Sequence, residues 1–91
     1  MKIQFYLDPD TGLPHIYKHG INEYEVEEVL QNPGEDRQGS KGTRIIIGQT
    51  FAGRYLRIIC KIESNSIFVI TAYELKGKPL TAYKRRRHRR M

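Results

Sequence analysis

Alternating apolar and polar residues predict a sheet built mainly from the second half of the chain. Residues 43–48, 54–62 and 67–73 have strand patterns, and short polar segments separate them. Neighbouring strands joined by short connections form an antiparallel meander. The segment 67–73 is almost continuously apolar, which predicts a position near the middle of the sheet. A shorter strand is predicted at residues 3–7, where Ile3, Phe5 and Leu7 share one face.

The segment 54–62 alternates most clearly, so its two faces can be assigned. One face carries Leu56, Ile58, Cys60 and Ile62, and the other carries Tyr55, Arg57, Ile59 and Lys61. The first set is expected in the core. In the segment 43–48, three isoleucines are consecutive, and the pattern leaves open which of them point inward.

One helix is predicted with both of its ends. Asn22 is a good N-cap, Glu25 follows three residues later as in a capping box, and Ile21 and Val26 fit a hydrophobic staple. Val26, Val29 and Leu30 form its apolar stripe. The sequence Asn32-Pro33-Gly34 ends the helix.

Three other segments are assigned from shorter patterns. Residues 14–20 predict one or two turns of helix between Pro14 and Gly20. Residues 35–41 are polar and predict a loop. A last helix opens at Lys78-Pro79 and places Leu80, Tyr83 and Arg87 along one face.

Together these elements predict a small α+β fold. The short N-terminal strand and the three-stranded meander form an antiparallel sheet, with helices near the N-terminus and a basic helix at the C-terminus. Ninety-one residues make one domain, residues 1–91, whose basic terminal segment is residues 84–91.

The charge of the chain is concentrated in that terminal segment. The chain has 16 basic and 10 acidic residues, giving a net charge of +6. The basic residues of the segment account for that whole excess: Lys84, Arg85, Arg86, Arg87, Arg89 and Arg90. Such a concentration favours a polyanionic partner over a merely solubilising tail.

Composition also predicts a compartment and excludes several kinds of site. The single cysteine, Cys60, lies in an apolar strand pattern and fits a buried residue in a reducing environment. The N-terminus lacks a signal-peptide pattern, and no apolar run reaches membrane-spanning length, so we expect a cytoplasmic protein without a membrane partner. The few His and Cys residues have no ligand spacing, and no phosphate-binding glycine loop is present. We therefore expect no metal and no cofactor.

Several short motifs, taken in order, resemble a known family. They are Phe5-x-x-Asp8-Pro9, Lys18-His19-Gly20-Ile21, Glu27-Glu28-Val29-Leu30-x-Asn32-Pro33, Arg44 with Ile47-Gly48, Arg57-Ile58-Ile59, Ile70-Thr71-Ala72 and a terminal helix with Tyr83. Over roughly residues 5–83 the chain is similar to the BrnT-type toxins and their uncharacterised relatives, which are grouped with the RelE/ParE toxins of bacterial type II toxin–antitoxin systems.

The resemblance implies a RelE-like domain that acts as a metal-independent endoribonuclease, inhibits translation and is neutralised by a cognate antitoxin protein. Oligomeric state is left open between a homodimer and a toxin–antitoxin hetero-oligomer. The chain departs from the family where Tyr73-Glu74 follows Ile70-Thr71-Ala72, because that strand end typically continues with an Arg. Either Lys76, Lys78 or a terminal arginine replaces this cation, or the activity is lost or changed.

Cleavage of RNA without a metal needs a base, an acid and cations that stabilise the phosphorane. His19, Arg57 and Tyr83 are the candidate catalytic residues. The candidate RNA-binding residues supply cations for phosphates and an aromatic ring for a base: Lys18, Arg44, Arg54, Lys61, Tyr73, Lys78, Lys84, Arg85, Arg86, Arg87, Arg89 and Arg90.

Other interpretations stay open for these residues and for the whole chain. His19 can simply interact with a helix end before Gly20, and Tyr83 can be a packing residue. The chain can be a non-catalytic nucleic-acid-binding module that uses its basic C-terminal helix. Alternatively, that helix binds an acidic antitoxin segment, which adds a strand to the sheet edge.

Overall fold

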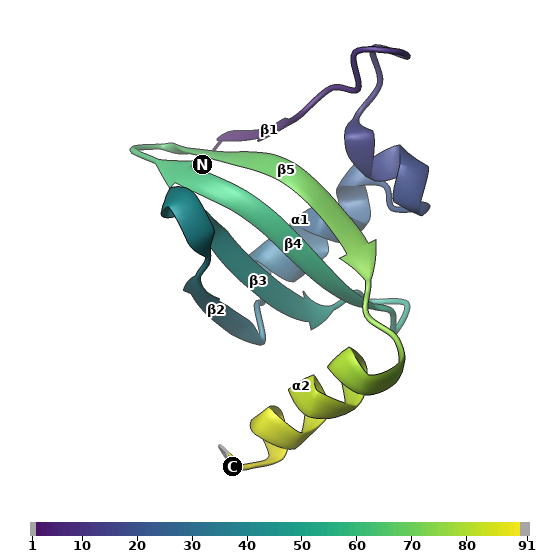
Figure 1. Ribbon diagram of the computed structural model, residues 1–91, viewed down its shortest axis with the longest axis vertical. Helices are drawn as coiled ribbons and strands as arrows, with labels where there is room; N and C mark the ends of the chain where they lie inside the picture. The colour runs from purple at the N-terminus through teal and green to yellow at the C-terminus, as the bar shows by residue number, and fades with distance from the viewer. Residues whose placement is uncertain (1, 90–91) are drawn as a thin grey trace.

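The structure, a computed structural model, describes residues 2–89. The described residues form a five-stranded sheet in the order β1-β5-β4-β3-β2, with helices on both of its sides (Figure 1). The elements in chain order are β1 (Lys2–Phe5), the 3₁₀ helix η1 (His15–His19), α1 (Glu23–Gln31), β2 (Glu35–Gln38), the 3₁₀ helix η2 (Ser40–Gly42), β3 (Arg44–Gln49), β4 (Tyr55–Glu63), β5 (Ser66–Glu74) and α2 (Gly77–Arg89).

The predicted α+β fold is confirmed, and so is the antiparallel meander of β3, β4 and β5. β5 lies inside the sheet, between β4 and β1. The prediction of an all-antiparallel sheet was wrong in one respect, because β1 pairs with β5 in parallel. The long connection from β1 through η1, α1 and three strands brings the chain back along β5 in the same direction, and no local pattern encodes that direction.

The predicted loop at residues 35–41 was also wrong in part. Residues Glu35–Gln38 form the edge strand β2, which pairs antiparallel with β3. The segment contains no apolar residue, so its strand conformation is stabilised by hydrogen bonds to β3 and not by an alternating pattern. A charged edge strand also discourages unwanted pairing with other chains.

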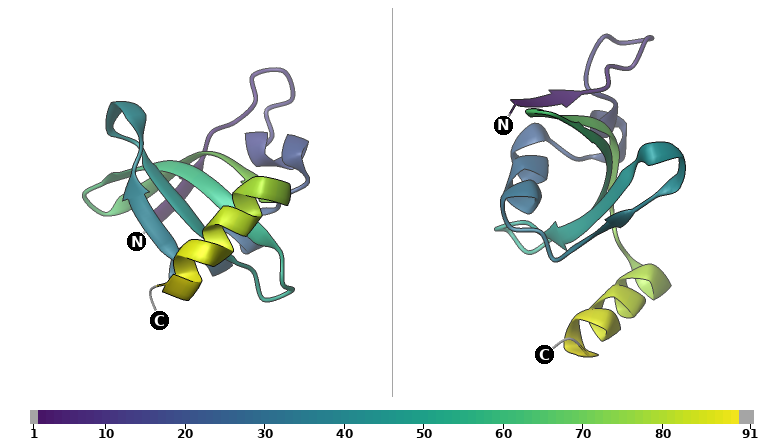
Figure 2. Two further views of the ribbon diagram at one scale, coloured as in Figure 1. Left: turned by 60° about the horizontal axis from the view of Figure 1, so that its bottom comes forward. Right: turned by 90° about the vertical axis from the view of Figure 1, so that its left-hand side faces the viewer.

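Two hydrophobic clusters hold the fold together, one on each side of the sheet. On the inner face, α1 and η1 cover the sheet, and the side chains of Val26, Val29 and Ile16 join those of Ile46, Ile58 and others. The fit between α1 and β3 is tight, since a Cβ atom on Gly48 would lie 2.9 Å from Val29 Cγ1. Figure 2 shows that α1 lies on the concave side of the curved sheet and that α2 lies on the other side.

The face assignment of β4 is confirmed for most of its length. Leu56, Ile58 and Cys60 are fully buried. Ile62 was predicted in the same row but is 43% exposed, because the end of β4 extends beyond the helices that cover the inner face. Leu7 is likewise exposed, since the chain has left β1 by that point. In β3, Ile46 points toward α1, and Ile45 and Ile47 point to the other side.

The capping box at the start of α1 is confirmed. The backbone N–H of Glu25 donates to Asn22 Oδ1 at 2.9 Å, and the backbone N–H of Asn22 donates to Glu25 Oε1 at 3.2 Å. Ile21 and Val26, the residues of the predicted staple, are both buried. The predicted helix at residues 14–20 forms as the 3₁₀ helix η1 and ends at Gly20, which has the left-handed conformation typical of a helix end.

α2 is attached to the other side of the sheet by a small second cluster. Tyr83 and Leu75 are buried there with Ile47, and Tyr55 and Leu80 pack around them. Gly34, in the turn before β2, lies against the hydroxyl of Tyr83. A Cβ atom at this position would overlap that hydroxyl, so the packing of α2 requires glycine here. The basic helix predicted from Lys78-Pro79 is thus a folded part of the domain.

We predict that Gly34→Ala destabilises the protein by about 1–3 kcal/mol, the usual cost of forcing extra atoms into a packed site. Chemical denaturation of the folded protein measures this free energy. Adding Tyr83→Phe to the variant removes the overlapping hydroxyl, so the double variant recovers part of the loss. Wild-type stability in Gly34→Ala alone would contradict the packing described for α2.

We predict that Cys60 does not react with thiol reagents in the folded protein. Burial in the inner cluster raises the pKa of its thiol to about 11, with the Asp36 carboxylate adding to the shift. Labelling at pH 8 should be at least about a hundredfold slower in native protein than in urea, because the thiolate is the reactive form. Equal rates in both conditions would show that the inner cluster opens readily.

Candidate nucleic-acid interface

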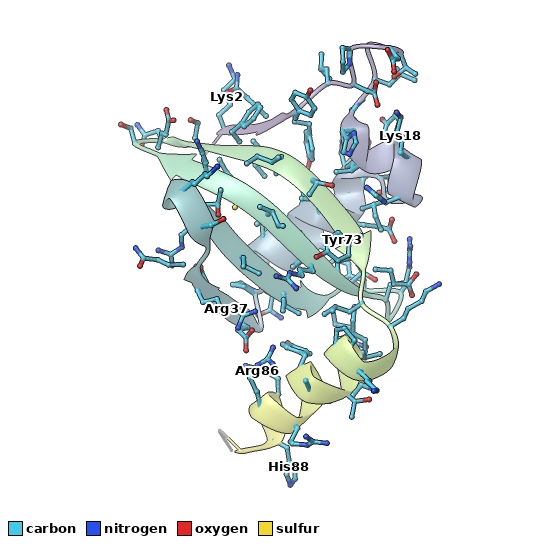
Figure 3. The ribbon with its side chains drawn as sticks, in the orientation of Figure 1. Lys2, Lys18, Arg37, Tyr73, Arg86 and His88 are labelled. Carbon is cyan, nitrogen blue, oxygen red and sulfur yellow. The ribbon has the colours of Figure 1, made fainter. Side chains whose placement is uncertain are left out.

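The side of the sheet turned away from α1 is called here the outer face, and it carries Arg57, Thr71 and Tyr73. Arg57 of β4 and Tyr73 of β5 are direct partners in the sheet register. The guanidinium carbon of Arg57 lies 6.0 Å from the centre of the Tyr73 ring, close enough for a cation–π contact. Figure 3 shows Tyr73 on β5, with Lys18 farther away on η1.

His19 reaches the same place from η1. Its ring centre lies 6.2 Å from that of Tyr73. The structure therefore brings together three residues that the sequence analysis nominated separately, His19, Arg57 and Tyr73. They come from η1, β4 and β5, and the pairing of β4 with β5 and the packing of η1 against β5 set their spacing.

Two aromatic side chains that the sequence analysis did not nominate extend this row. The His15 ring lies 5.4 Å from the His19 ring in an edge-on arrangement, and the Tyr6 ring lies 6.0 Å from His15. The spacing of the two histidines along residues 15–19 was visible in the sequence. Their closeness to Tyr73 was not, because it depends on how η1 packs on the sheet.

Asp8 anchors this end of the site. Its carboxylate is nearly buried and contacts Lys18 Nζ at 2.6 Å and His15 Nδ1 at 3.5 Å, and it accepts a hydrogen bond from the backbone N–H of Asp10 at 2.9 Å. The Lys18 contact, followed by the Asp10 N–H, lowers the pKa of Asp8. Lys18, a predicted RNA-binding residue, is thus paired with a carboxylate at the rim of the row.

Polar atoms on the outer face have hydrogen-bonding capacity that the described residues leave unused. The side-chain Nε of Arg57 and the Oγ1 of Thr71 are both buried, and neither has a hydrogen-bond partner within residues 2–89. Such atoms are uncommon in folded proteins and often mark functional positions. Thr71 was not nominated from sequence, since a lone threonine in a strand has no distinguishing pattern.

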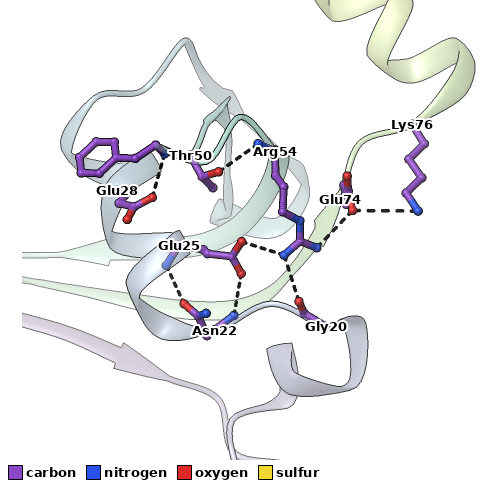
Figure 4. Close-up of polar contacts among 9 residues, drawn as sticks. Gly20, Asn22, Glu25, Glu28, Thr50, Arg54, Glu74 and Lys76 are labelled. Atoms are coloured by element: carbon purple, nitrogen blue, oxygen red, sulfur yellow. Dashed lines mark hydrogen bonds and ion pairs between the residues drawn. The ribbon is translucent and has the colours of Figure 1, made fainter.

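Arg54, another predicted RNA-binding residue, is held on the side of the sheet that α1 covers, and Figure 4 shows its contacts. One guanidinium nitrogen donates to Glu25 Oε2 at 2.7 Å and to the carbonyl of Gly20 at 3.2 Å, and the other donates to Glu74 Oε1 at 3.1 Å. Arg54 thereby joins the end of η1, the first turn of α1 and the end of β5. These contacts give it a structural role in positioning η1.

Arg44 and Lys61 lie apart from each other. Arg44 donates to Asp36 Oδ1 from Nη2 at 2.7 Å and from Nε at 3.0 Å, and its register partner Cys60 places it on the inner side. Lys61 is exposed on the outer face opposite Phe68. Of these two predicted RNA-binding residues, only Lys61 shares a face with Tyr73.

Tyr83, predicted to be catalytic, lies in the second cluster and not in the row with His19. It is 4% exposed, its ring centre lies 6.0 Å from that of Tyr55, and burial raises its pKa. This environment matches the packing interpretation that the sequence analysis left open for the residue.

The basic residues of α2 divide into those that contact the domain and those that point away. Lys84 Nζ lies 5.1 Å from the Tyr55 ring centre, Arg86 forms a two-bond pair with Glu35 at 2.7 and 2.9 Å, and Arg87 donates to the Gly34 carbonyl at 2.7 Å. Lys78 and Arg85 are exposed. The Arg89 side chain and all of Arg90 lie outside the residues that the structure describes.

A cleft of about 540 Å³ opens between α2, the turn before β2 and the β3–β4 hairpin. Tyr55 connects it to the outer face, because Tyr55 lies two residues before Arg57 on the same side of β4. The lining residues are Asn32, Pro33, Gly34, Gln49, Thr50, Phe51, Tyr55, Tyr83, Lys84, Arg87 and His88. The sequence analysis missed this cleft because its walls come from three separate parts of the chain.

Two further observations concern the described part of the chain. Within residues 2–89, no group of three or more His, Cys, Asp or Glu side chains is arranged to hold a metal ion. No helix in the same range is both long enough and apolar enough to cross a membrane.

Comparisons with known proteins give one match. Searches of curated proteins and of solved structures find none. Residues 15–74 match a family described as "Domain of unknown function (DUF4258)", and the matched region runs from the start of η1 to the end of β5. It contains His15, His19, Arg57 and Tyr73 and ends before α2. Because the match covers well over half of the 91-residue chain, the chain belongs to this family of domains.

Proposed function

We propose that the protein binds single-stranded RNA across its outer face and cleaves it without a metal ion. The row formed by His19, Tyr73 and Arg57 is the observation that carries this proposal. It combines a titratable imidazole, an aromatic ring and a guanidinium on an accessible surface, which are the groups that RNA cleavage through the 2′-hydroxyl requires.

The roles follow from the chemistry of each group. His19 accepts the proton of the 2′-hydroxyl, and the 2′-oxygen attacks the adjacent phosphorus. Arg57 stabilises the charge on the phosphorane, while Tyr73 stacks against a base. The bond from phosphorus to the 5′-oxygen then breaks, which leaves a 2′,3′-cyclic phosphate. His15 contacts Asp8, and its ring lies 5.4 Å from that of His19; in its imidazolium form it donates its own proton to the leaving 5′-oxygen, while His19 keeps the proton taken from the 2′-hydroxyl.

In this proposal, the guanidinium of Arg57 takes the place of the arginine expected after Ala72. Tyr73 occupies the position of that cation, and Arg57 lies directly across from it on β4. A guanidinium is therefore available on the same face at the same register. Lys76, Lys78 and the α2 arginines add positive charge nearby along the chain.

The biological role that fits this activity is that of a toxin of a type II toxin–antitoxin system, acting on RNA in the cytoplasm to inhibit translation. The neutralising partner is an antitoxin protein. The exposed cations of α2 suit an acidic segment of that partner, and the sheet has edge strands, β1 and β2, to which an added strand can pair. Co-expression with the product of a neighbouring small reading frame tests this partnership, and growth inhibition that no such product relieves would contradict it.

A non-catalytic nucleic-acid-binding module is the second candidate function. The concentration of cations on α2 favours it, because such a helix can hold a phosphate backbone without any chemistry on the sheet. RNA that binds tightly and remains intact would support this alternative over cleavage.

We predict that purified protein cleaves RNA in the presence of EDTA and that His19→Gln lowers the rate by about a hundredfold, a typical loss for removal of a general base. Arg57→Gln should lower the rate as well, because the phosphorane loses its guanidinium. Gel analysis of end-labelled RNA measures both rates and identifies the cyclic phosphate.

Arg44→Gln is the matched control for Arg57→Gln. It makes the same substitution on the opposite side of the sheet, in an exposed ion pair that contributes little to stability, so the cleavage rate should not change. Intact RNA at high protein concentration, together with normal growth on expression, would contradict the proposed activity. Full activity in both site variants would remove His19 and Arg57 from the site.

We also predict that RNA affinity falls steeply with salt, since cations that bind phosphates release counterions. Replacing Lys78 and Arg85 by Ala should reduce the slope of log K against log salt by about 1.4, because each phosphate contact on a single strand contributes about 0.7. Replacing the exposed Lys2 and Lys41, which lie away from α2, is the control. Salt-independent binding would argue against α2 as part of the interface.

A further inference from the structure

The cleft beside α2 carries an exposed aromatic ring on a well-ordered turn. Phe51 is 80% exposed, and it lines the cleft. Its backbone N–H donates to Glu28 Oε1 at 2.9 Å. The turn that carries it is closed by hydrogen bonds from Gly53 N to the Thr50 carbonyl and from Arg54 N to Thr50 Oγ1, both at 3.0 Å.

Basic side chains line the opposite wall of the cleft. Lys84, Arg87 and His88 all come from α2. Lys84 is held over the Tyr55 ring, and Arg87 is fixed by its hydrogen bond to the Gly34 carbonyl, which leaves its other N–H groups available. Positive charge is therefore placed at defined positions next to an exposed ring.

Carboxamides complete the lining. Asn32 and Gln49 each offer donor and acceptor atoms, and Gln49 is steadied by a 3.3 Å hydrogen bond from Nε2 to the Gly53 carbonyl. A ring for stacking, amides for the edge of a base and cations for a phosphate are the groups that recognise a nucleotide in single-stranded RNA. An acidic peptide would use the cations but not the exposed ring or the amides.

We infer that this cleft is a subsite for one nucleotide of a single-stranded RNA. The base stacks on Phe51, and the phosphate lies near Lys84 and His88. The volume of about 540 Å³ is in the range of small-molecule sites. Because Tyr55 joins the cleft to the outer face, the same strand can continue from the cleft past Tyr55 to Arg57 and Tyr73. This inference rests on the proposed function, since it names a second contact for the same RNA.

The test uses a short 2′-O-methyl RNA, which binds but cannot be cleaved through its 2′-oxygen, and adenosine 5′-monophosphate as a single-nucleotide probe. NMR shift mapping on the full chain should show changes at residues 32–34, 49–51 and 84–88 with both probes. Phe51→Ala should weaken binding of the oligonucleotide by about tenfold, the usual size of a base–aromatic contact. Lys84→Ala should weaken it too and lower its salt dependence.

Tyr24→Ala is the matched control, because Tyr24 is another exposed aromatic residue, 76% exposed, and lies on α1 away from the cleft. It should leave oligonucleotide binding unchanged.

The outcomes separate this inference from the proposed function. If the oligonucleotide shifts only outer-face residues and Phe51→Ala binds as tightly as the wild type, the subsite is wrong and the proposed function stands. If the oligonucleotide shifts the cleft residues and Phe51→Ala weakens its binding but unmodified RNA is not cleaved, the subsite stands and the proposed cleavage fails. If hexaglutamate shifts the cleft as strongly as the oligonucleotide and Phe51→Ala affects neither, charge alone explains binding and the subsite is overturned.

Discussion

The contact between Tyr83 and Gly34 holds the two parts of this molecule together. α2 carries much of the positive charge, and such a helix repels itself and has little reason to fold alone. Burial of Tyr83 against Ile47 and Leu75 gives it an apolar anchor, and the missing side chain at Gly34 makes the room. The Arg86–Glu35 pair and the Arg87 hydrogen bond then fix the rotation of the helix. The cleft exists because α2 is held in this place.

A second set of contacts positions the other end of the outer face. Arg54 joins Gly20, Glu25 and Glu74, so that the end of η1, the start of α1 and the end of β5 are fixed relative to one another. Asp8 fixes the other side of η1 through Lys18 and His15. With η1 held from both sides, the imidazoles stay beside Tyr73. Arg54 and Lys18, which were predicted to bind RNA, therefore hold η1 in its position beside the sheet.

The two sides of the sheet differ in the helices that cover them and in the side chains they carry. The inner face is closed by α1, and its side chains are apolar and tightly packed. Among residues 2–89, α2 packs on one end of the outer face, and beyond that point the face presents Arg57, Thr71 and Tyr73. A sheet with one buried and one open side allows polar groups in every second position without weakening the core. In the proposed function, this alternation supplies the RNA-binding surface.

The sequence alone determined the elements whose patterns are local. The capping box defined α1, the alternation in β4 separated core from surface, and the row of basic residues marked the charged end of the chain, because each depends on neighbours in sequence. The tertiary structure alone decided the parallel pairing of β1, the strand at Glu35–Gln38, the pairing of Arg54 with carboxylates and the burial of Tyr83. It also decided that His19 lies beside Tyr73, that His15 lies beside His19, and that Phe51 faces α2 across a cleft. Those features join residues far apart in the chain, and their geometry follows from packing that no single stretch of sequence encodes.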